Sequence, residues 1–541
     1  MKDISSTGSF VDFTLENFIY VDKTVYIPQL VKLKRVFISR PRRFGKSLTL
    51  DTIATLFETG VEPYFKGTWI YDKWTEPTYP VLRLNFLNFD KNSIEKFNNK
   101  LNSKITEFAE LNHVTTYKEK EEAEDSIDHL LEQLRLEGRQ IVILIDEYDC
   151  QMTANINNET LYKQFQEKIK SFYANLKDKF AIKFLGITGV TRLKDVSIFS
   201  VGSDIRDITN SSAYSQMIGF TRDEIKKYYI DYLKLAASCE NNCTVDNVTE
   251  AQIESLLDRL AKNYDGYCFD EDNEKKVFST WSVNKFFQTM IEKKKVQFGE
   301  YWYDNGGLPS ILVNYLKTHE LNIFEYLDKD KFLKVSSDDF KNPTALTTIN
   351  QNVLMCQTGY LTLRSDLNKT STVALGIPNG EIYKALNRLL ANNIFKGNTD
   401  ITDDYGRSLL EVGTVDDIIN LFNSALNSVS YDNYPIVSES SVQNMLKLYL
   451  LGAHQEVLSE VHEAKGRADL IVNTDNRRIV FEFKYAKNET ETKAKLSEAV
   501  EQIKTRDYGN ILPKKNELIR IAAVFNADPK VRAFTENQIV L

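Results

Sequence analysis

A short apolar run that ends in a glycine–lysine–serine turn constrains the fold of this chain more than any other stretch. The residues Val36-Phe37-Ile38 are β-branched or aromatic, as is typical of a buried strand. A polar loop follows them, and Gly45-Lys46-Ser47 then opens a segment with helical periodicity. A strand, a loop and a helix in this order predict one unit of an α/β sheet.

The loop between this strand and helix resembles a P-loop, in which backbone N–H groups and a helix N-terminus bind phosphates. In that arrangement Lys46 reaches the terminal phosphates and the Ser47 hydroxyl ligates Mg²⁺. The usual pattern, G-x-x-x-x-G-K-[ST], has glycine where Arg40 stands here. We expect Pro41 to fix the turn another way, and the arginines of the loop to add positive charge near the phosphates. The predicted nucleotide-binding residues of the loop are Arg42, Arg43, Phe44, Gly45, Lys46, Ser47 and Leu48.

A second apolar run, Ile141–Ile145, ends in the two carboxylates Asp146 and Glu147. A continuous run of this kind predicts a strand buried on both faces of a parallel sheet, and ligands bind at the carboxyl ends of such strands. We expect Asp146 to hold the Mg²⁺ that Ser47 also contacts, and Glu147 to polarise a water for attack on the γ-phosphate. Taken alone, Asp-Glu after a strand could also be a cap.

A third apolar run, Ile182–Ile187, places Thr188 at its carboxyl end. A polar residue there is suited to orient water or to sense the γ-phosphate, and Thr188 joins the predicted nucleotide site. Arg192 could stabilise transition-state charge in the manner of an arginine finger, in cis or across a subunit interface, which leaves a homo-oligomer open. An ordinary surface arginine is the alternative for Arg192.

The composition limits the kinds of protein this chain can be. At 541 residues, with 42% hydrophobic and 27% charged residues, it should fold into roughly two to four globular domains. The net charge of −8 excludes a general attraction to nucleic acid, so any such contact must come from a local groove. Five cysteines fit a reducing compartment. Nowhere does an apolar run reach the roughly 18 residues that a membrane span needs, and we expect a cytoplasmic protein without a membrane partner.

The C-terminal part shows a helix, three strands, a helix and a further strand, at residues 441–451, 457–462, 469–473, 478–484, 491–505 and 519–525. Asp469 begins the second strand, and Glu482-Phe483-Lys484 ends the third. Alternation along a strand puts Glu482 and Lys484 on one face, where Asp469 of the neighbouring strand can share a divalent metal with Glu482.

These residues suit metal-dependent hydrolysis of a phosphodiester. Mg²⁺ or Mn²⁺ would polarise the phosphate and lower the pKa of the attacking water, while Lys484 would orient that water or stabilise the developing charge. The helix and strand order and these residues resemble the core of PD-(D/E)XK nucleases, and the resemblance implies that Glu460, on the preceding strand, is an auxiliary acid and metal ligand. The alternative is that Glu-x-Lys forms a solvated cross-strand face, or that the domain binds without cleaving.

Four phrases of the N-terminal part resemble those of the AAA-ATPase-like proteins, which couple a P-loop ATPase module to a PD-(D/E)XK nuclease-like domain. They are Tyr20-Val21-Asp22-Lys23-Thr24, the loop at 40–47, Ile145–Asp149 and Gly186–Arg192. For the first phrase we favour a capped helix start over nucleotide contact. The resemblance implies an α/β fold with an ASCE/AAA-like parallel sheet and a helical lid, followed by an αβββαβ restriction-endonuclease-like domain. It divides the chain into residues 1–215, 216–375 and 376–541.

The sequence therefore favours an ATP-binding and ATP-hydrolysing switch fused to a nuclease that acts on DNA, with RNA not excluded. The expected cofactors are ATP and Mg²⁺, with Mg²⁺ or Mn²⁺ at the nuclease site. One alternative is a regulatory or scaffold protein whose nuclease-like domain only binds its partner. A second is an ATP-driven nucleic-acid motor, which the acidic balance and the lack of helicase-like motifs disfavour.

Overall fold

The protein consists of two compact units, described separately below. The computed structural model describes residues 1–177, 179–193, 204–304, 310–316, 319, 323–343, 345–395, 405–453, 455–463, 466–510 and 515–540. The N-terminal unit comprises Met1–Leu321 and Asp330–Ile382, and the C-terminal unit comprises Asn322–Lys329 and Tyr383–Leu541. The three predicted domain ranges stay predictions.

A five-stranded parallel sheet forms the centre of the N-terminal unit. Its strands are β1 (Arg35–Ser39), β2 (Val81–Asn85), β3 (Ile141–Asp146), β4 (Ile182–Gly189) and β5 (Arg206–Asp207). They lie in the order β2-β3-β4-β1-β5, and every pair is parallel. The predicted α/β class is confirmed. Because β4 lies between β1 and β3, three polar strand ends meet at one edge of the sheet.

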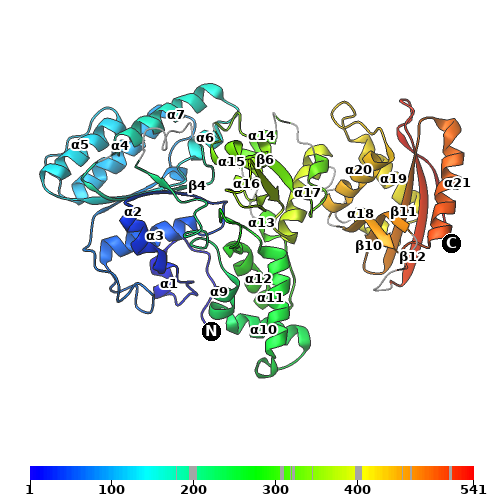
Figure 1. Cartoon of the computed structure of the whole chain (residues 1–541), viewed down its shortest axis with the longest axis horizontal. Coiled ribbons are helices and arrows are strands. Elements are labelled where there is room, and N and C mark those ends of the chain that lie inside the picture. The colour runs from blue at the N-terminus through cyan, green and yellow to red at the C-terminus, as the bar shows by residue number, and fades with distance from the viewer. Residues whose placement is uncertain are drawn as a thin grey trace. The chain divides into compact units, whose positions relative to one another are not determined.

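Helices cover both faces of this sheet. Figure 1 shows α4 (Ile94–Leu111), α5 (Ala123–Leu136) and α7 (Glu159–Ala174) on one side and α2 (Ile27–Leu33) and α3 (Lys46–Thr59) on the other. The strands β1, β3 and β4 are nearly fully buried, which explains their continuous apolar runs. The N-terminal helix α1 (Phe10–Leu15) and the short α6 (Cys150–Ala154) complete this part.

The rest of the N-terminal unit is mainly helical. Four helices share an aromatic and aliphatic core: α9 (Arg222–Tyr228), α10 (Ile230–Asn241), α11 (Glu250–Tyr264) and α12 (Thr280–Lys293). A small antiparallel sheet has the order β6-β8-β7, with β6 at Leu333–Ser336, β7 at Thr362–Leu363 and β8 at Thr372–Gly376. The remaining helices are α13 (Tyr301–Asp304), α14 (Ser310–Leu316), α15 (Ser337–Lys341), α16 (Gln351–Gln357) and α17 (Gly380–Ile394), the last of which continues into the C-terminal unit.

The C-terminal unit contains the predicted αβββαβ order. After α18 (Tyr405–Val412) and α19 (Val415–Asn427) come α20 (Glu439–Gly452), β9 (Glu456–Glu463), β10 (Gly466–Asn473), β11 (Arg477–Ala486), α21 (Glu489–Arg506) and β12 (Glu517–Asn526). An additional edge strand, β13 (Ala533–Ile539), pairs with β12. The sheet order is β13-β12-β11-β10-β9, in which only β11 and β12 are parallel. Ala499 and Ile503 of α21 pack on this sheet.

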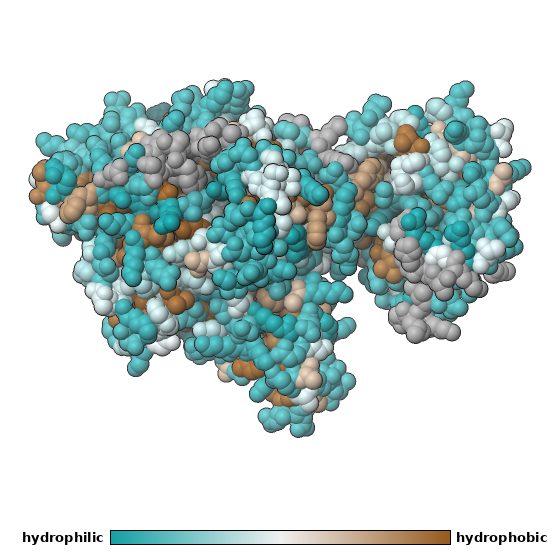
Figure 2. Space-filling model, in the orientation of Figure 1, coloured by the Kyte–Doolittle hydropathy of each residue, from teal (hydrophilic) through white to brown (hydrophobic). Residues whose placement is uncertain are grey.

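Hydrophilic residues predominate on the face drawn in Figure 2, as the 27% of charged residues leads one to expect. Among the helices in the described part of the chain, none combines the length and the apolar character needed to cross a membrane.

Candidate functional site

The loop between β1 and α3 has the geometry of a phosphate-binding turn. Gly45, at the N-cap of α3, has a φ of +101°, a conformation that favours glycine. No side chain caps α3, so its first N–H groups point into the loop. The Lys46 Nζ donates to the carbonyl oxygens of Arg40 at 3.1 Å and Pro41 at 3.2 Å. The ammonium group is therefore held inside the turn, where a phosphate would replace the carbonyl contacts.

Two of the predicted residues, Ser47 and Thr188, contact a third, Asp146, which is the last residue of β3. Its Oδ2 accepts a hydrogen bond from Ser47 Oγ at 2.6 Å, and its Oδ1 accepts one from Thr188 Oγ1 at 2.6 Å. These residues come from α3, β3 and β4, whose ends the sheet order brings together. A hydroxyl beside a carboxylate supplies hard oxygen ligands for Mg²⁺.

Glu147 follows Asp146 in the left-handed conformation, with a φ of +53°. Its Oε1 lies 3.8 Å from Lys46 Nζ. Burial raises the pKa of Glu147; the Lys46 ammonium opposes that rise, and Asp149 and Asp146 add to it. A carboxylate with a raised pKa beside the phosphate loop is suited to act as a general base.

Asp149, two residues further, has a structural role. It is almost fully buried and accepts hydrogen bonds from Val190 N at 3.3 Å, Thr191 N at 2.7 Å and Thr191 Oγ1 at 2.6 Å. These bonds fix the turn at Val190 and Thr191, which directly follows the end of β4 where Thr188 contacts Asp146.

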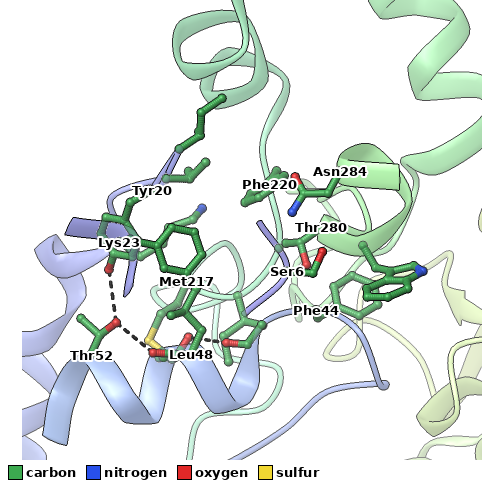
Figure 3. Close-up of a pocket in the computed structure, with 18 of the residues that line it drawn as sticks. Ser6, Tyr20, Lys23, Phe44, Leu48, Thr52, Met217, Phe220, Thr280 and Asn284 are labelled. Atoms are coloured by element: carbon green, nitrogen blue, oxygen red, sulfur yellow. Dashed lines mark hydrogen bonds between the residues drawn. The ribbon is translucent and has the colours of Figure 1, made fainter. Parts of the chain in front are cut away.

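A cavity of about 160 Å³ lies beside the phosphate loop (Figure 3). It is mainly apolar, and its lining includes Tyr20, Leu48, Met217, Phe220, Trp281 and Asn284. A mostly apolar cavity with a few polar groups, placed next to a phosphate loop, has the character of a nucleoside site. The sequence favours a capped helix start for the Tyr20–Thr24 phrase, and Asp22 Oδ1 does accept a hydrogen bond from Thr24 N at 2.9 Å. Tyr20 and Lys23 also line the cavity, which the local pattern did not reveal.

In the C-terminal unit, β10 and β11 bring Asp469 and Glu482 together. The register pairs Leu470 with Phe481, so Asp469 and Glu482 are the next residues along the two antiparallel strands. Asp469 Oδ2 accepts from Phe483 N at 2.8 Å. Lys484 Nζ lies 2.9 Å from Glu482 Oε1 and 3.3 Å from Glu439 Oε1. We refer to Asp469 and Glu482 as the carboxylate pair.

The carboxylate pair has the electrostatics of a cation site. Burial is the main cause that raises the pKa of Asp469 to about 6 and that of Glu482 to about 7. The negative charge of Asp469 is the second cause that raises the pKa of Glu482. Glu482 is fully buried, and its Oε2 has no hydrogen-bond partner among the described residues. A buried, unsatisfied carboxylate oxygen beside a second carboxylate fits a divalent ion.

The described residues contain no group of three or more His, Cys, Asp or Glu side chains arranged to hold a metal. Water, a phosphate oxygen or a backbone carbonyl would have to complete the shell around the carboxylate pair. Glu460 lies on β9, but its side chain falls outside the described residues.

Glu439 is a site residue that the sequence did not suggest. It stands in the first turn of α20, and its carboxylate contacts Lys484. Gln443, one turn further along α20, hydrogen-bonds Asp469 and lowers its pKa. Because α20 also carries Ser440, Ser441, Asn444 and Lys447, its sequence does not distinguish Glu439 and Gln443 from other polar residues of the helix.

Two segments of the chain match known protein families. Residues 5–199 match the family model described as "Predicted AAA-ATPase", and residues 437–535 match that of the PD-(D/E)XK nuclease superfamily. The chain therefore carries an AAA-ATPase-like domain and a PD-(D/E)XK domain. A protein of Azotobacter chroococcum mcd 1, named "Uncharacterized protein in vnfD 5′region", is 26% identical over 95% of this chain and 94% of its own length.

Two solved structures also show a limited likeness. One is Cdc6p from Pyrobaculum aerophilum, 10% identical over 68% of this chain and 91% of that chain, with a TM-score of 0.23. The other is the Aeropyrum pernix ORC1 protein in complex with DNA, which is 9% identical over 71% of this chain and 97% of that chain, with a TM-score of 0.28. At these scores the likeness carries no argument about this chain.

Within the AAA-ATPase-like domain, the arginine that replaces the usual glycine faces away from the loop. Arg40 is almost fully buried, and its Nη1 donates to Ser39 O at 2.9 Å and Thr209 O at 2.6 Å. Its guanidinium also lies 4.2 Å from the Phe269 ring centroid. Burial lowers the pKa of Arg40 to about 9. Arg40 thus connects the loop to the segment after β5 through its hydrogen bond to Thr209. The positive charge expected near the phosphates therefore has to come from other residues.

Arg43 is also held by backbone groups of the same unit. Its Nη1 donates to Tyr301 O and Trp302 O, each at 2.8 Å, and its guanidinium lies 4.7 Å from the Trp281 ring centroid. Its φ is +70°. In this geometry Arg43 contributes a backbone N–H to the loop, as does Phe44, whose ring is buried. Arg42 is half-buried, and its charge opposes the rise in the pKa of Glu147.

Arg192 follows β4 of the AAA-ATPase-like domain and is paired within its own unit. Its Nε forms an ion pair with Asp207 Oδ2, and its backbone N and O both bond to the Gln357 side chain at 3.2 Å. To act on a phosphate, Arg192 would have to leave Asp207. Its role as an arginine finger stays a prediction.

Proposed function

We propose that the chain is an ATP-binding and ATP-hydrolysing switch fused to a metal-dependent nuclease that cleaves DNA. The observation that supports the nuclease most directly is the buried Glu482 opposite Asp469: its Oε1 accepts from Lys484, and its Oε2 has no hydrogen-bond partner among the described residues. The ATPase proposal rests on Ser47, Asp146 and Thr188 meeting at the end of the phosphate loop. The two domain matches agree with this combination.

For ATP, the loop backbone and the α3 N-terminus would bind the phosphates, and Lys46 would exchange its carbonyl contacts for phosphate oxygens. Ser47 and Asp146 would hold Mg²⁺, which neutralises phosphate charge when bound. Glu147 would accept a proton from the attacking water, and Thr188 would orient that water through its contact with Asp146. The neighbouring apolar cavity would take the nucleoside.

For the phosphodiester, hydrolysis forms a bond between a water oxygen and phosphorus and breaks the P–O bond to the leaving nucleotide. The carboxylate pair would hold Mg²⁺ or Mn²⁺, which supplies charge stabilisation and acidifies water when bound. Lys484 would stabilise charge on the phosphate oxygens, and Glu439 and Glu482 position its ammonium group. A net charge of −8 makes binding depend on this local site.

Metal-dependent DNA cleavage, measured with and without ATP, tests the proposal. Wild type, Glu147→Gln and Lys484→Ala are compared with Lys487→Ala, which removes an exposed lysine three residues further along. Cleavage should be lost in Lys484→Ala and retained in Lys487→Ala. Cleavage that survives Lys484→Ala refutes the nuclease assignment and favours a domain that binds without cleaving. If the rate of cleavage changes neither with ATP nor with Glu147→Gln, the proposal that ATP binding and hydrolysis control DNA cleavage is refuted.

A further inference from the structure

The last turn of α21 carries an arginine toward the carboxylate pair. Arg506 is the final residue of this helix and is partly exposed. Its Nη1 donates to the Tyr508 hydroxyl at 2.7 Å. This hydrogen bond raises the pKa of Arg506, and the charges of Glu482 and Asp469 contribute smaller increases. Among the described residues, Arg506 nevertheless forms no ion pair.

A glycine at the start of β10 determines where this arginine can lie. A Cβ built on Gly466 would be 2.5 Å from Arg506 Cδ and 3.2 Å from the Tyr508 hydroxyl. The arginine side chain therefore passes directly over Gly466, three residues before Asp469 on the same strand. Tyr508 itself is fully buried, so its hydroxyl is a fixed acceptor. Gly466 and Tyr508 therefore hold the Arg506 guanidinium at the start of β10, the strand that also carries Asp469.

A guanidinium in this position suits a phosphate. It presents several N–H donors in a planar fork, and only one of its hydrogen bonds is used within the described residues. A buried pair of acids repels a polyanion, so a substrate strand needs a cation at the rim of the site. We propose that Arg506 binds a backbone phosphate of the nucleic-acid strand, next to the phosphate that is cleaved. This inference rests on the proposed nuclease function.

Three variants of the full-length protein test the assignment. Arg506→Gln removes the charge and keeps most of the side-chain length. Gly466→Ala adds a methyl group that displaces the flexible arginine but needs no strained backbone. Lys504→Gln is the matched control, because it removes one charge from an exposed position two residues earlier on α21. Thermal unfolding of each variant checks that the fold is retained.

Binding is measured with fluorescein-labelled single-stranded and duplex DNA in EDTA, across about 50–200 mM salt. Arg506→Gln should weaken binding about tenfold and lower the salt slope by about one, as expected for one lost phosphate contact. Gly466→Ala should also weaken DNA binding and lower the salt slope, but by less than Arg506→Gln does. With Mg²⁺ present, Arg506→Gln should raise KM about tenfold and change kcat little.

The outcomes separate this inference from the nuclease function. If Arg506→Gln matches Lys504→Gln in affinity and salt slope while wild type cleaves DNA, Arg506 is not a phosphate ligand and the nuclease function stands. If wild type binds DNA through Arg506 but never cleaves it, the phosphate contact stands and the nuclease function fails. Wild type that binds neither DNA form at low salt overturns the inference.

Discussion

Ser47 Oγ donates a hydrogen bond of 2.6 Å to Asp146 Oδ2, joining two residues that are 99 positions apart in the sequence. One begins the helix after the phosphate loop, and the other ends a fully buried strand. Neither residue needs the other for its local structure, because α3 starts at the Gly45 turn and β3 is held by its neighbouring strands. The contact brings a hydroxyl and a carboxylate oxygen together, as the proposed Mg²⁺ site requires.

Ser47→Ala should abolish most of the gain in ATP affinity that Mg²⁺ provides. The methyl group cannot ligate the ion, so we expect Mg²⁺-dependent binding to weaken about tenfold and binding in EDTA to stay the same. Calorimetric titration with and without Mg²⁺ measures both. Thr59→Ala, at the exposed far end of the same helix, is the control. Equal losses with and without Mg²⁺ would contradict metal ligation by Ser47.

Glu147 and Asp149 should respond differently to amide substitution. Glu147→Gln should lower ATP hydrolysis by about 10²–10³-fold and leave ATP binding intact, because it removes a proton acceptor beside the phosphate loop. Asp149→Asn should lower the free energy of unfolding by roughly 2–3 kcal/mol, because three hydrogen bonds lose their charged acceptor. The steady-state rate of ATP hydrolysis tests the prediction for Glu147→Gln, and thermal unfolding tests that for Asp149→Asn. A Glu147→Gln variant with normal turnover would assign the base elsewhere.

The parts of the fold that the sequence predicted correctly depend on short-range periodicity. The run Ile141–Ile145 is apolar throughout because helices cover both faces of β3, and this local signal identified a parallel sheet. The αβββαβ order was likewise readable, since Glu482 and Lys484 alternate with two buried phenylalanines on β11. The edge strand β13 was missed because its burial is low and its sequence, Ala-Phe-Thr-Glu-Asn-Gln-Ile, has little alternation.

The site contacts that the sequence did not predict are tertiary. Glu439 reaches Lys484 across 45 positions, and nothing within α20 indicates that its first turn faces a metal site. Arg40 was expected to add charge near the phosphates, but its guanidinium bonds to Thr209, 169 positions away. Such contacts depend on the packing of distant segments, which a local pattern does not encode.

Arg40→Gly, which restores the glycine of the usual P-loop pattern, should destabilise the protein. It deletes three buried hydrogen bonds and the contact with Phe269, so we expect a loss of roughly 3 kcal/mol in the free energy of unfolding. Thermal unfolding and ATP titration are the measurements. Arg42→Ala is the counterpart, because it should weaken ATP binding and leave stability nearly unchanged. If Arg40→Gly tightened ATP binding and left the free energy of unfolding unchanged, Arg40 would not stabilise the fold and would only weaken phosphate binding relative to glycine.

Glu381, at the start of α17, should make the stability of the N-terminal unit fall as the pH rises. The carboxylate is 2% exposed, and it accepts from Ser282 Oγ at 2.7 Å and from Trp302 N at 2.8 Å. Burial raises its pKa from 4.5 to about 8, although both hydrogen bonds oppose the rise. Between these two values the folded state keeps a proton that the unfolded chain has released. Folding therefore loses stability across this window.

Glu381→Gln should remove this dependence, because glutamine retains an acceptor for Trp302 N and cannot ionise. The thermal midpoint of the variant should match wild type near pH 5 and exceed it increasingly toward pH 8, by a free energy of roughly 1–3 kcal/mol at the upper end. Glu292→Gln, an exposed position on α12, is the control and should follow wild type throughout. A constant offset between Glu381→Gln and wild type at every pH would show that the Glu381 carboxyl is ionised in the folded protein across the window.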